Sequence, residues 1–407
     1  MTSPAGAARA PFPVADRVGR FNYAIRNIVA EARALEASGR RVRYLNIGDP
    51  VAFGFQTPPP MIAAVERALR DGHNGYGPSV GILPARQSIA GELTRRGFPV
   101  SPDRVVVTAG TSEAIELALG ALVDPGGEVL VPVPTYPLYT AVLARLDAEA
   151  RFYRLDAAQG WMPDLDHLRS LITPRTRAIV VIDPNNPTGA VYPPAVRRAL
   201  IELAETHRLV LLADEVYGDV AYAGPVDPIG SLAPDAPIIS CSSLSKGYLA
   251  PGWRTGWLAV GRSPLLDPVL AAVQKLADAR LCSSVPMQHA IVAAIDGDRS
   301  HQAAFRAALH ERAVLTTRRM NAIDGISCVE PQAAFYAMPK VALPPGRTDV
   351  DYVLGLLRAT GVLCVYGSGF NTAAGDGFFR IVFLAPPAEL DEMYGAIATF
   401  TDRFLHA

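Results

Sequence analysis

The sequence is poor in lysine and cysteine, contains no long apolar run and carries no excess of either charge. Thirty-eight Lys and Arg residues are balanced by 39 Asp and Glu residues, which excludes the strongly basic surface of a nucleic-acid-binding protein. No stretch approaches the ~20 apolar residues of a membrane helix, and the first residues hold no signal-peptide core. These absences predict a cytoplasmic protein whose partners are small molecules, with no nucleic acid and no membrane.

The four cysteines stand singly, at Cys241, Cys282, Cys328 and Cys364, and the seven histidines are scattered along the chain. Zinc clips and redox motifs need closely spaced cysteines, so neither is predicted. We expect reduced core thiols and no metal ion.

Only three of the 38 basic residues are lysine, namely Lys246, Lys275 and Lys340. Arginine can replace lysine wherever a cation has only to be solvated, but only a primary amine can lose its proton and attack a carbonyl. Lys275 lies in a helical pattern and Lys340 follows a strand, so we interpret both as structural or surface residues. Lys246 follows a buried strand in a loop of polar, glycine and aromatic residues, which makes it the candidate for covalent chemistry.

The chain has 407 residues, half of them hydrophobic, which suits one large α/β unit with an elaboration or two domains. Short apolar runs alternate with amphipathic helical patterns through the middle of the sequence. This alternation predicts an α/β fold with a mostly parallel sheet flanked by helices on both sides. The expected strands are 104–108, 128–133, 177–183, 209–214, 237–243 and 256–261, and the clearest helices are 112–122 and 194–207.

Both ends of the chain differ from this middle part. An Ala- and Pro-rich arm precedes a helix expected at about residues 23–38, and an α+β pattern follows residue 301. We predict a large domain over residues 61–300 and a smaller α+β domain formed by residues 301–407 with the N-terminal arm and segment, 1–60. In the C-terminal part we expect helices at 303–322 and from Pro387, and strands at 326–329, 335–338, 362–365 and 379–382.

Polar side chains follow two of the predicted strands, at the edge where open parallel sheets bind ligands. Asp214 ends one strand, and Tyr217 lies three residues further on. As an acidic residue in that place, Asp214 is either a cofactor partner or a cap. Asn186 lies in a tight Pro- and Gly-containing turn after another strand, and a bare turn is the simpler interpretation of that segment.

Three features predict binding of anions. The Gly-Thr-Ser sequence at 110–112 joins a strand to a helix, where free N–H groups and the helix dipole can bind phosphate, although the same residues also make an ordinary cap. Arg254 is either a natural charged partner for such a phosphate or an arginine exposed on the surface. Arg380 lies in an apolar strand, where a substrate carboxylate or an internal Asp or Glu would satisfy it.

One ligand would satisfy all these groups: an aldehyde for Lys246, a phosphate for residues 110–112 and Arg254, and a basic ring nitrogen for Asp214. Pyridoxal phosphate has all three. The sequence resembles the fold-type-I aminotransferases of class I/II from Tyr23 to the end. The motifs that carry this resemblance are LNIGDP, GHNGYGPSVGILPAR, TAGTSEAI, PTYPLY, PNNPTGAVY, ADEVY, SLSKGYLAPGWRTGW and FRIVFLAPP.

Within that family the sequence looks most like the alanine aminotransferases. The segments that carry this closer resemblance are YAIRNIVAEARALEASGRRVRYLNIGDPVAFGF, RLCSSVPMQHAI and LCVYGSGF. The resemblance implies a homodimer with shared active sites.

The resemblance also implies roles for single residues around the cofactor. Lys246 would bond the cofactor aldehyde and carry a proton, and Asp214 would keep the pyridine nitrogen protonated. Tyr217 and Asn186 would hydrogen-bond the ring oxygen, and Tyr136 would stack on the ring. The phosphate would be bound by Gly110, Thr111, Ser112, Ser243 and Arg254, with Tyr76 reaching in from a second subunit.

For the substrate, the resemblance implies that Arg380 binds the α-carboxylate beside the Gly48 backbone. Tyr23 and Arg26 would cover the pocket and sense the side chain, or would serve helix packing and surface charge. The sequence gives no second arginine that we can assign to a distal carboxylate. We therefore favour a small neutral amino acid, alanine above all, paired with a 2-oxo acid such as 2-oxoglutarate or pyruvate.

Two further possibilities remain at this point. The same cofactor residues could serve elimination or replacement at the β or γ carbon, cyclisation or decarboxylation in specialised biosynthesis. Ala333 stands where relatives usually carry glycine, and its methyl group would narrow the pocket or reshape the loop. A sensor domain of a transcription regulator is disfavoured, because fewer than fifty residues precede LNIGDP and the charge is balanced.

Overall fold

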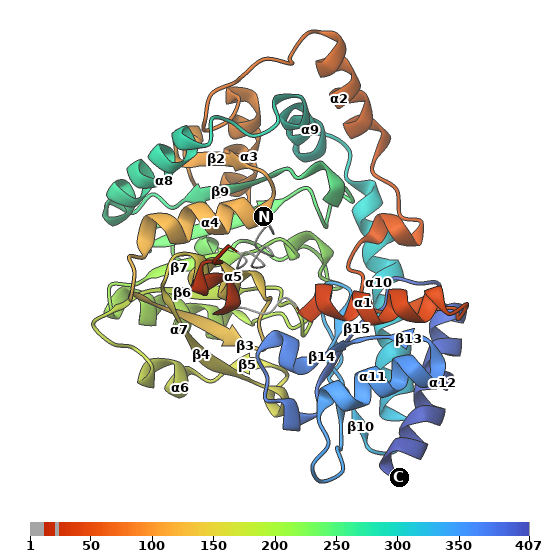
Figure 1. Cartoon of the computed structure of the whole chain (residues 1–407). Helices are drawn as coiled ribbons and strands as arrows, with labels where there is room; N and C mark the ends of the chain where they lie inside the picture. Colours follow the sequence, from red (N-terminus) through yellow and green to blue (C-terminus); the bar gives the residue numbers. More distant parts are fainter. Residues whose placement is uncertain (1–11, 21–23, 407) are drawn as a thin grey trace, which may run out of the picture.

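The computed structural model describes residues 12–20 and 24–406, arranged around one large sheet (Figure 1). The sheet is mostly parallel, as the sequence predicts, and in it only β9 and β5 run antiparallel to their neighbours. Its strand order is β2 (Val105–Thr108), β9 (Gly256–Val260), β8 (Ile238–Ser243), β7 (Val210–Asp214), β6 (Thr176–Ile182), β3 (Glu128–Val133), β4 (Glu149–Asp156) and β5 (Met162–Pro163).

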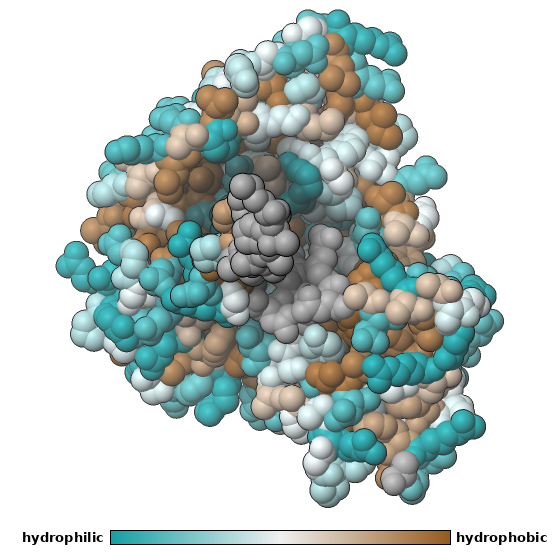
Figure 2. Space-filling model, viewed as in Figure 1, coloured by the Kyte–Doolittle hydropathy of each residue, from teal (hydrophilic) through white to brown (hydrophobic). Residues whose placement is uncertain are grey.

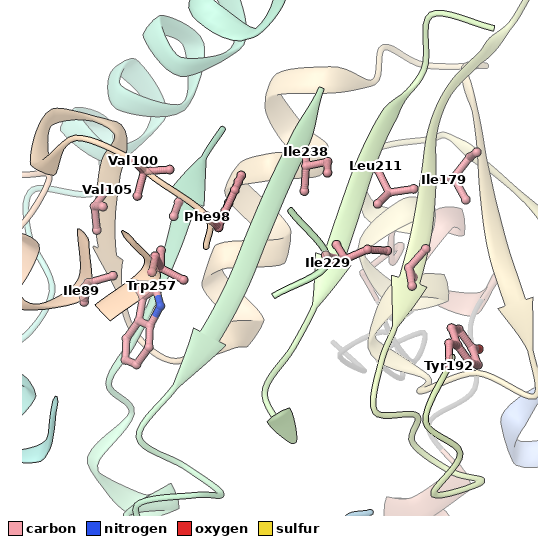
Figure 3. Packing of buried hydrophobic residues seen from close by; sticks show 14 of the residues in the cluster. Ile89, Phe98, Val100, Val105, Ile179, Tyr192, Leu211, Ile229, Ile238 and Trp257 are labelled. Atoms are coloured by element: carbon pink, nitrogen blue, oxygen red, sulfur yellow. The ribbon is translucent and has the colours of Figure 1, made fainter. Parts of the chain in front are cut away.

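Both faces of this sheet are buried, because the strands are apolar on both sides. Side chains alternate along a strand, so Val105 and Val107 belong to one hydrophobic cluster and Val106 to the other. Figure 3 shows the first cluster, where Leu211 and Ile238 from neighbouring strands point to the same face. Its helices are α2 (Pro59–Arg70), α3 (Leu83–Arg95), α6 (Leu165–Ser170), α7 (Pro194–Thr206) and α9 (Val285–Ile295).

The opposite face of the sheet packs against three further helices. Ile115 and Leu119 of one helix and Val273 of another are buried there with Val106 of β2. These helices are α4 (Thr111–Leu122), α5 (Leu138–Arg145) and α8 (Asp267–Ala279).

A third hydrophobic cluster joins the N-terminal helix to the C-terminal part of the chain. In Figure 1 these elements lie together beside the large sheet, in red, cyan and blue. The helices are α1 (Ala24–Ala37), α10 (Ser300–Asn321), α11 (Asp349–Thr360) and α12 (Pro387–Leu405). The strands are β1 (Arg43–Tyr44), β10 (Ile326–Ser327), β11 (Tyr336–Ala337), β12 (Lys340–Val341), β13 (Val362–Leu363), β14 (Val365–Tyr366) and β15 (Phe379–Val382). The domain boundaries after residues 60 and 300 stay a prediction.

The strands expected in the middle of the sequence agree with the structure to within two residues, and the strand expected at 379–382 is confirmed as β15. The strands expected at 326–329 and 335–338 are shorter, as β10 and β11. The single strand expected at 362–365 is divided at Cys364 into β13, which pairs with β1, and β14, which pairs with β15. The long strand β4 is not expected from its sequence, because four of its eight residues are charged and only Tyr153 and Leu155 are buried.

No helix in the described ranges is long and apolar enough to cross a membrane. The four cysteines are free; three are buried, and Cys282 is partly exposed. Within residues 12–20 and 24–406, no three His, Cys, Asp or Glu side chains gather as a metal site would require. The metal-free expectation stays a prediction.

Candidate active site

The carboxyl ends of the parallel strands meet at one edge of the sheet and enclose a cavity of about 620 Å³. β7 ends at Asp214 and β8 at Ser243, while β9 runs in the opposite direction and begins just after Arg254. This antiparallel strand therefore brings its amino end to the same edge. The predicted site residues that line the cavity are Gly48, Thr111, Ser112, Tyr136, Asn186, Asp214, Tyr217, Ser243, Lys246, Arg254 and Arg380.

Lys246 extends from the loop after β8 into this cavity. Its Nζ donates a hydrogen bond to the Gly48 carbonyl at 2.8 Å and lies 5.3 Å from the centroid of the Phe335 ring. Lys275 and Lys340 are exposed. Of the three lysines, Lys246 alone is held in the cavity, with its amine against one backbone oxygen.

Asp214 is buried beside the lysine, and this burial raises the pKa of its carboxyl group to about 6. Hydrogen bonds from the Tyr139 hydroxyl, at 3.1 Å, and from the Val216 N–H, at 3.4 Å, act in the opposite direction and favour the ionised form. Ionisation of a buried carboxyl is costly without a nearby cation. Asp214 therefore creates a demand for positive charge in the cavity, which a protonated ring nitrogen can meet.

The start of α4 forms a cradle for an anion. Its N-cap, Gly110, has a φ of +81° and lies against the guanidinium of Arg254 so closely that a Cβ at position 110 would overlap it. The buried hydroxyl of Thr111 finds no hydrogen-bond partner among the described residues. In the part of the chain that the structure describes, Arg254 donates only to backbone carbonyls, those of Ala109 and Pro251. Helix-start N–H groups, an unsatisfied hydroxyl and a guanidinium are the donor set that a phosphate needs.

Arg380 lies opposite the cradle on β15 and is almost completely buried. It donates to the Asn46 carbonyl at 3.0 Å and to the Asn186 side-chain oxygen at 3.3 Å. Its guanidinium carbon lies 4.7 Å from the ring centroids of both Tyr336 and Phe370. These contacts hold the guanidinium at the wall of the cavity, where a planar set of N–H donors matches the geometry of a carboxylate.

Three side chains connect this arginine to the centre of the site. The Asn186 amide donates to the Tyr217 hydroxyl at 3.4 Å, and the Tyr217 hydroxyl lies 2.9 Å from that of Tyr336. Burial raises the pKa of Tyr217 well above its usual range, and the neighbouring Tyr336 adds to this shift. Tyr217 therefore stays a neutral phenol that can donate its proton.

Several residues proposed from the sequence lie elsewhere. Tyr76 is 87% exposed and does not line the cavity. Tyr23 lies outside the described residues, and Arg26 is in α1, three residues before Val29, which lines the cavity. Ala333 is buried away from the cavity lining, where its N–H donates to the Gly189 carbonyl at 3.0 Å. Its methyl group therefore does not narrow this pocket.

Sequence reasoning missed three residues of the site: Asn46, Tyr139 and Tyr336. Tyr139 follows Tyr136 by three residues in PTYPLY, and Tyr336 ends PQAAFY, so both lie in motifs that were noted for other residues. A buried tyrosine usually has a hydrogen-bond partner, which is the signal that could have identified them.

A larger cleft, of about 890 Å³, lies elsewhere, between β4, β5 and residues 321–340. Its lining contains neither Lys246 nor Asp214, and Arg154 and Asp164 in it pair with each other at 2.7 Å. Its other charged residues, Asp156, Lys340 and Asp376, are exposed. The cleft therefore lacks the buried acid of the smaller cavity, although it is more spacious.

Taken together, a lysine amine, a buried acid that demands a cation and a phosphate cradle define the site of a pyridoxal-phosphate-dependent enzyme of fold type I. Comparison with known proteins leads to the same class. Residues 42–397 match the family model "Aminotransferase class I and II". The chain belongs to this family, and as an aminotransferase it uses pyridoxal phosphate as its cofactor.

Individual relatives cover most of the chain. It is 40% identical to the alanine aminotransferase of Mycobacterium tuberculosis over 89% of this chain and 86% of that protein. It is 37% identical to the glutamate-pyruvate aminotransferase AlaA of Escherichia coli over 97% of this chain and 99% of that protein. The solved structure of the alanine aminotransferase from Pyrococcus furiosus matches with a TM-score of 0.93 and 40% identity, covering 96% of this chain and all of that one.

Proposed function

We propose that this aminotransferase moves an amino group between a small neutral amino acid, alanine above all, and a 2-oxo acid such as 2-oxoglutarate or pyruvate. The observation that carries the proposal is that Lys246, Asp214 and Arg380 share one cavity of about 620 Å³. The relatives at 37–40% identity, two named for alanine and one for glutamate and pyruvate, support this choice of substrates.

In this proposal each residue has a defined task at the cofactor. Pyridoxal phosphate supplies an aldehyde for the amine and a protonated ring that withdraws electrons from the substrate carbon. Lys246 attaches the cofactor and moves a proton at the substrate Cα, and Asp214 holds the ring nitrogen in its protonated form. Tyr217 and Asn186 donate to the ring oxygen, and Tyr136 covers one face of the ring. Gly110, Thr111, Ser112, Ser243 and Arg254 bind the phosphate.

Substrate binding follows from the remaining groups. Arg380 binds the α-carboxylate through parallel hydrogen bonds, beside the Gly48 backbone. The cations that line the cavity, in the described part of the chain, are Lys246, Arg254 and Arg380, and each already has a task. This supports a donor whose side chain is small and uncharged. We assign Tyr23 and Arg26 to covering the pocket and sensing that side chain.

We also propose a homodimer in which Tyr76 completes the phosphate site of the partner subunit. Tyr76 lies at an exposed position outside its own cavity. Apolar side chains are also exposed on α2 at Leu69, on α8 at Leu276 and just after α8 at Leu281. Figure 2 shows brown, hydrophobic residues in the upper part of the view, where Figure 1 places α2 and α8. A cytoplasmic location stays a prediction.

The function is tested by incubating holoenzyme with a panel of amino acids and 2-oxo acids and identifying the products by mass. Alanine with 2-oxoglutarate should give pyruvate and glutamate, and alanine alone should convert the bound cofactor to its amine form. A product with altered carbon connectivity would instead assign the chain to elimination, replacement, cyclisation or decarboxylation.

The attachment site is tested separately by reducing the holoenzyme with borohydride and mapping the labelled peptide. We expect the label on Lys246, because its amine is the only lysine amine that lines the cavity in the described residues. Label on Lys275 or Lys340, which are exposed, would contradict the assignment.

A further inference from the structure

Tyr336 has no task in the proposed function, yet it lies at the centre of the site. It is 3% exposed, belongs to β11 and lines the cavity. β11 pairs with β15, so that Tyr336 lies opposite Val382, two residues from Arg380. This pairing fixes the ring of Tyr336 beside the guanidinium.

The hydroxyl group of Tyr336 reaches Tyr217 at 2.9 Å. A phenol has one proton, so a Tyr217 that donates to a ligand in the cavity has to accept from its other neighbours. Tyr336 is then the donor in the pair. A hydroxyl that accepts a hydrogen bond becomes a stronger donor through its own proton.

The ring of Tyr336 does something else. It covers one side of the Arg380 guanidinium at 4.7 Å, while Phe370 lies at the same distance. Aromatic contacts of this kind hold the plane of an arginine in place and contribute cation–π attraction. Removal of this ring would let the guanidinium reorient.

Tyr336 also determines what position 48 can hold. A Cβ at Gly48 would lie 2.5 Å from the Tyr336 hydroxyl and 3.3 Å from the nearest ring carbon. Gly48 does not have a positive φ, so space and not backbone conformation excludes a side chain there. The carbonyl of Gly48 accepts the hydrogen bond from Lys246.

We propose that Tyr336 is a positioning residue that couples the carboxylate clamp, Arg380, to the phenol of Tyr217 and keeps the backbone of Gly48 next to Lys246. The inference rests on the proposed function and deepens it. Its hydroxyl acts through Tyr217, and its ring acts through Arg380.

The hydroxyl is tested with holoenzyme of the Tyr336→Phe variant, by titrating the visible absorbance of the bound cofactor with pH. Without the hydrogen bond from Tyr336, Tyr217 stabilises negative charge on the ring oxygen of the cofactor less well. The nitrogen that links Lys246 to the cofactor therefore holds its proton more tightly. We expect the midpoint of the absorbance titration to rise by about 0.3–1 pH unit relative to wild type. We also expect kcat to fall about 3- to 10-fold, while KM for alanine changes less than about twofold.

Two comparisons make this test specific. In a Tyr217→Phe background, Tyr336→Phe should move the midpoint of the titration by less than about a third of its shift in the wild-type background. Equal shifts in the two backgrounds would show that the Tyr336 hydroxyl does not act through Tyr217. The control is Tyr222→Phe, which removes a hydroxyl that donates to the Ala333 and Ala334 carbonyls of the same loop without lining the cavity. This variant should leave the midpoint unchanged, and an equal shift in it would mean that loop structure alone is responsible.

The ring is tested with Tyr336→Leu. This variant should show the same shift of the midpoint and, in addition, a rise of about 10-fold in KM for both alanine and 2-oxoglutarate, because Arg380 loses one aromatic face. If the KM values equal those of Tyr336→Phe, the ring does not position Arg380.

A rescue experiment tests the contact with position 48. Gly48→Ala should lower kcat/KM about 10-fold or more in the wild-type background but less than about threefold in the Tyr336→Phe background, because the hydroxyl that overlaps the methyl group is gone there. Equal losses in the two backgrounds would contradict the steric assignment. Failure of the proposed function would be seen differently, as wild-type protein that forms no lysine-bound cofactor or no 2-oxo acid.

Discussion

At the scale of single residues, the environment of Asp214 decides how the site handles charge. Its carboxyl is buried between a tyrosine hydroxyl and a backbone N–H, and burial raises its pKa to about 6. The same residue at a solvated strand end would ionise freely and exert little influence on a ring nitrogen. Burial thus makes an ordinary aspartate into a group that binds a cation strongly.

Asp214→Asn should retain the cofactor, which Lys246 and the phosphate cradle still bind, and should lose turnover. A neutral amide cannot stabilise the protonated ring, so we expect kcat to fall about 100-fold or more. Steady-state kinetics with alanine and 2-oxoglutarate measure this. The matched control is Asp235→Asn, at an exposed ion pair with Arg262, which should keep wild-type rates. Near-normal turnover in Asp214→Asn would refute the role.

The raised pKa of Asp214 also predicts how the stability of the apoenzyme changes with pH. The folded chain keeps the proton of the Asp214 carboxyl up to about pH 6, whereas the unfolded chain releases it near the usual aspartate pKa of 3.8. This residue therefore makes the free energy of unfolding fall as pH rises between these two values. In the apoenzyme, Asp214→Asn removes this loss. The difference in free energy of unfolding between the variant and wild type should therefore grow by about 1–2 kcal/mol, in favour of the variant, from pH 5 to pH 8.

Urea denaturation of both apoenzymes at the two pH values measures this difference. A gain that is larger at pH 5 than at pH 8 would contradict the direction of the shift. Titration of both proteins after reloading with cofactor provides the comparison with the holoenzyme.

At the scale of elements, the junction of β2 with α4 and the start of β9 build the phosphate cradle by close approach of backbones. A Cβ at Gly256 would lie 2.6 Å from the backbone of Gly110, and a Cβ at Gly110 would overlap Arg254. The cradle therefore depends on two glycines from segments about 145 residues apart, which leave room for the guanidinium beside the helix start.

Gly110→Ala should weaken cofactor binding by about 10-fold or more, because its methyl group displaces Arg254 and adds strain at positive φ. Spectral titration of the apoenzyme with pyridoxal phosphate measures the Kd. Gly126→Ala is a matched control, since Gly126 has a similar φ of +78° and open space around it. Both variants should lose about 1–2 kcal/mol of stability from the left-handed backbone, but only Gly110→Ala should bind cofactor less tightly. Equal Kd values would contradict the cradle.

The turn that carries Asn186 is fixed by a buried ion pair between an element and a loop. Asp183, at the end of β6, pairs at 2.6 Å with Arg197 of α7, and its other oxygen accepts from the Tyr192 N–H at 3.0 Å. Both charged side chains are more than nine-tenths buried. The ion pair therefore anchors both ends of the segment that contains Asn186.

Arg197→Met should destabilise the protein by about 3–5 kcal/mol, because it leaves the buried carboxylate of Asp183 without its cation. Chemical denaturation measures the loss. Arg198→Met changes the exposed neighbour on the same helix and should cost less than about 0.5 kcal/mol. Similar losses in the two variants would show that the ion pair is not what holds this turn.

At the scale of the whole molecule, a site shared between two chains predicts complementation. Lys246→Ala removes the attachment point, and Tyr76→Ala removes the residue that we propose to reach the partner's phosphate site. A mixed dimer of the two variants contains one site with both residues intact. Co-expressed and purified as a heterodimer, it should regain up to about half of wild-type activity, whereas each variant alone stays well below this level. A heterodimer no more active than either parent would show that Tyr76 acts within its own chain or not at all.

Much of the fold could be predicted from the sequence because its cause is local. Apolar runs buried on both faces and separated by amphipathic segments specify a parallel sheet between helices, and the six predicted strands appear as β2, β3, β6, β7, β8 and β9. β4 was missed since its charged side chains mask the strand pattern, and short strands such as β13 and β14 depend on pairing with distant segments. For such strands the partner, and not the local sequence, supplies most of the stabilisation.

The sequence by itself determined the chemistry: a primary amine at Lys246, an acid at the end of a buried strand and a glycine before a helix can be inferred from residue type and neighbours. Only the tertiary structure decided which groups meet. The contact of Lys246 with Gly48 spans 198 residues, that of Arg254 with Ala109 spans 145, and that of Tyr217 with Tyr336 spans 119. The reason is that hydrogen bonds and burial depend on distance in space, and a distance across so many residues is set by the packing of the whole chain.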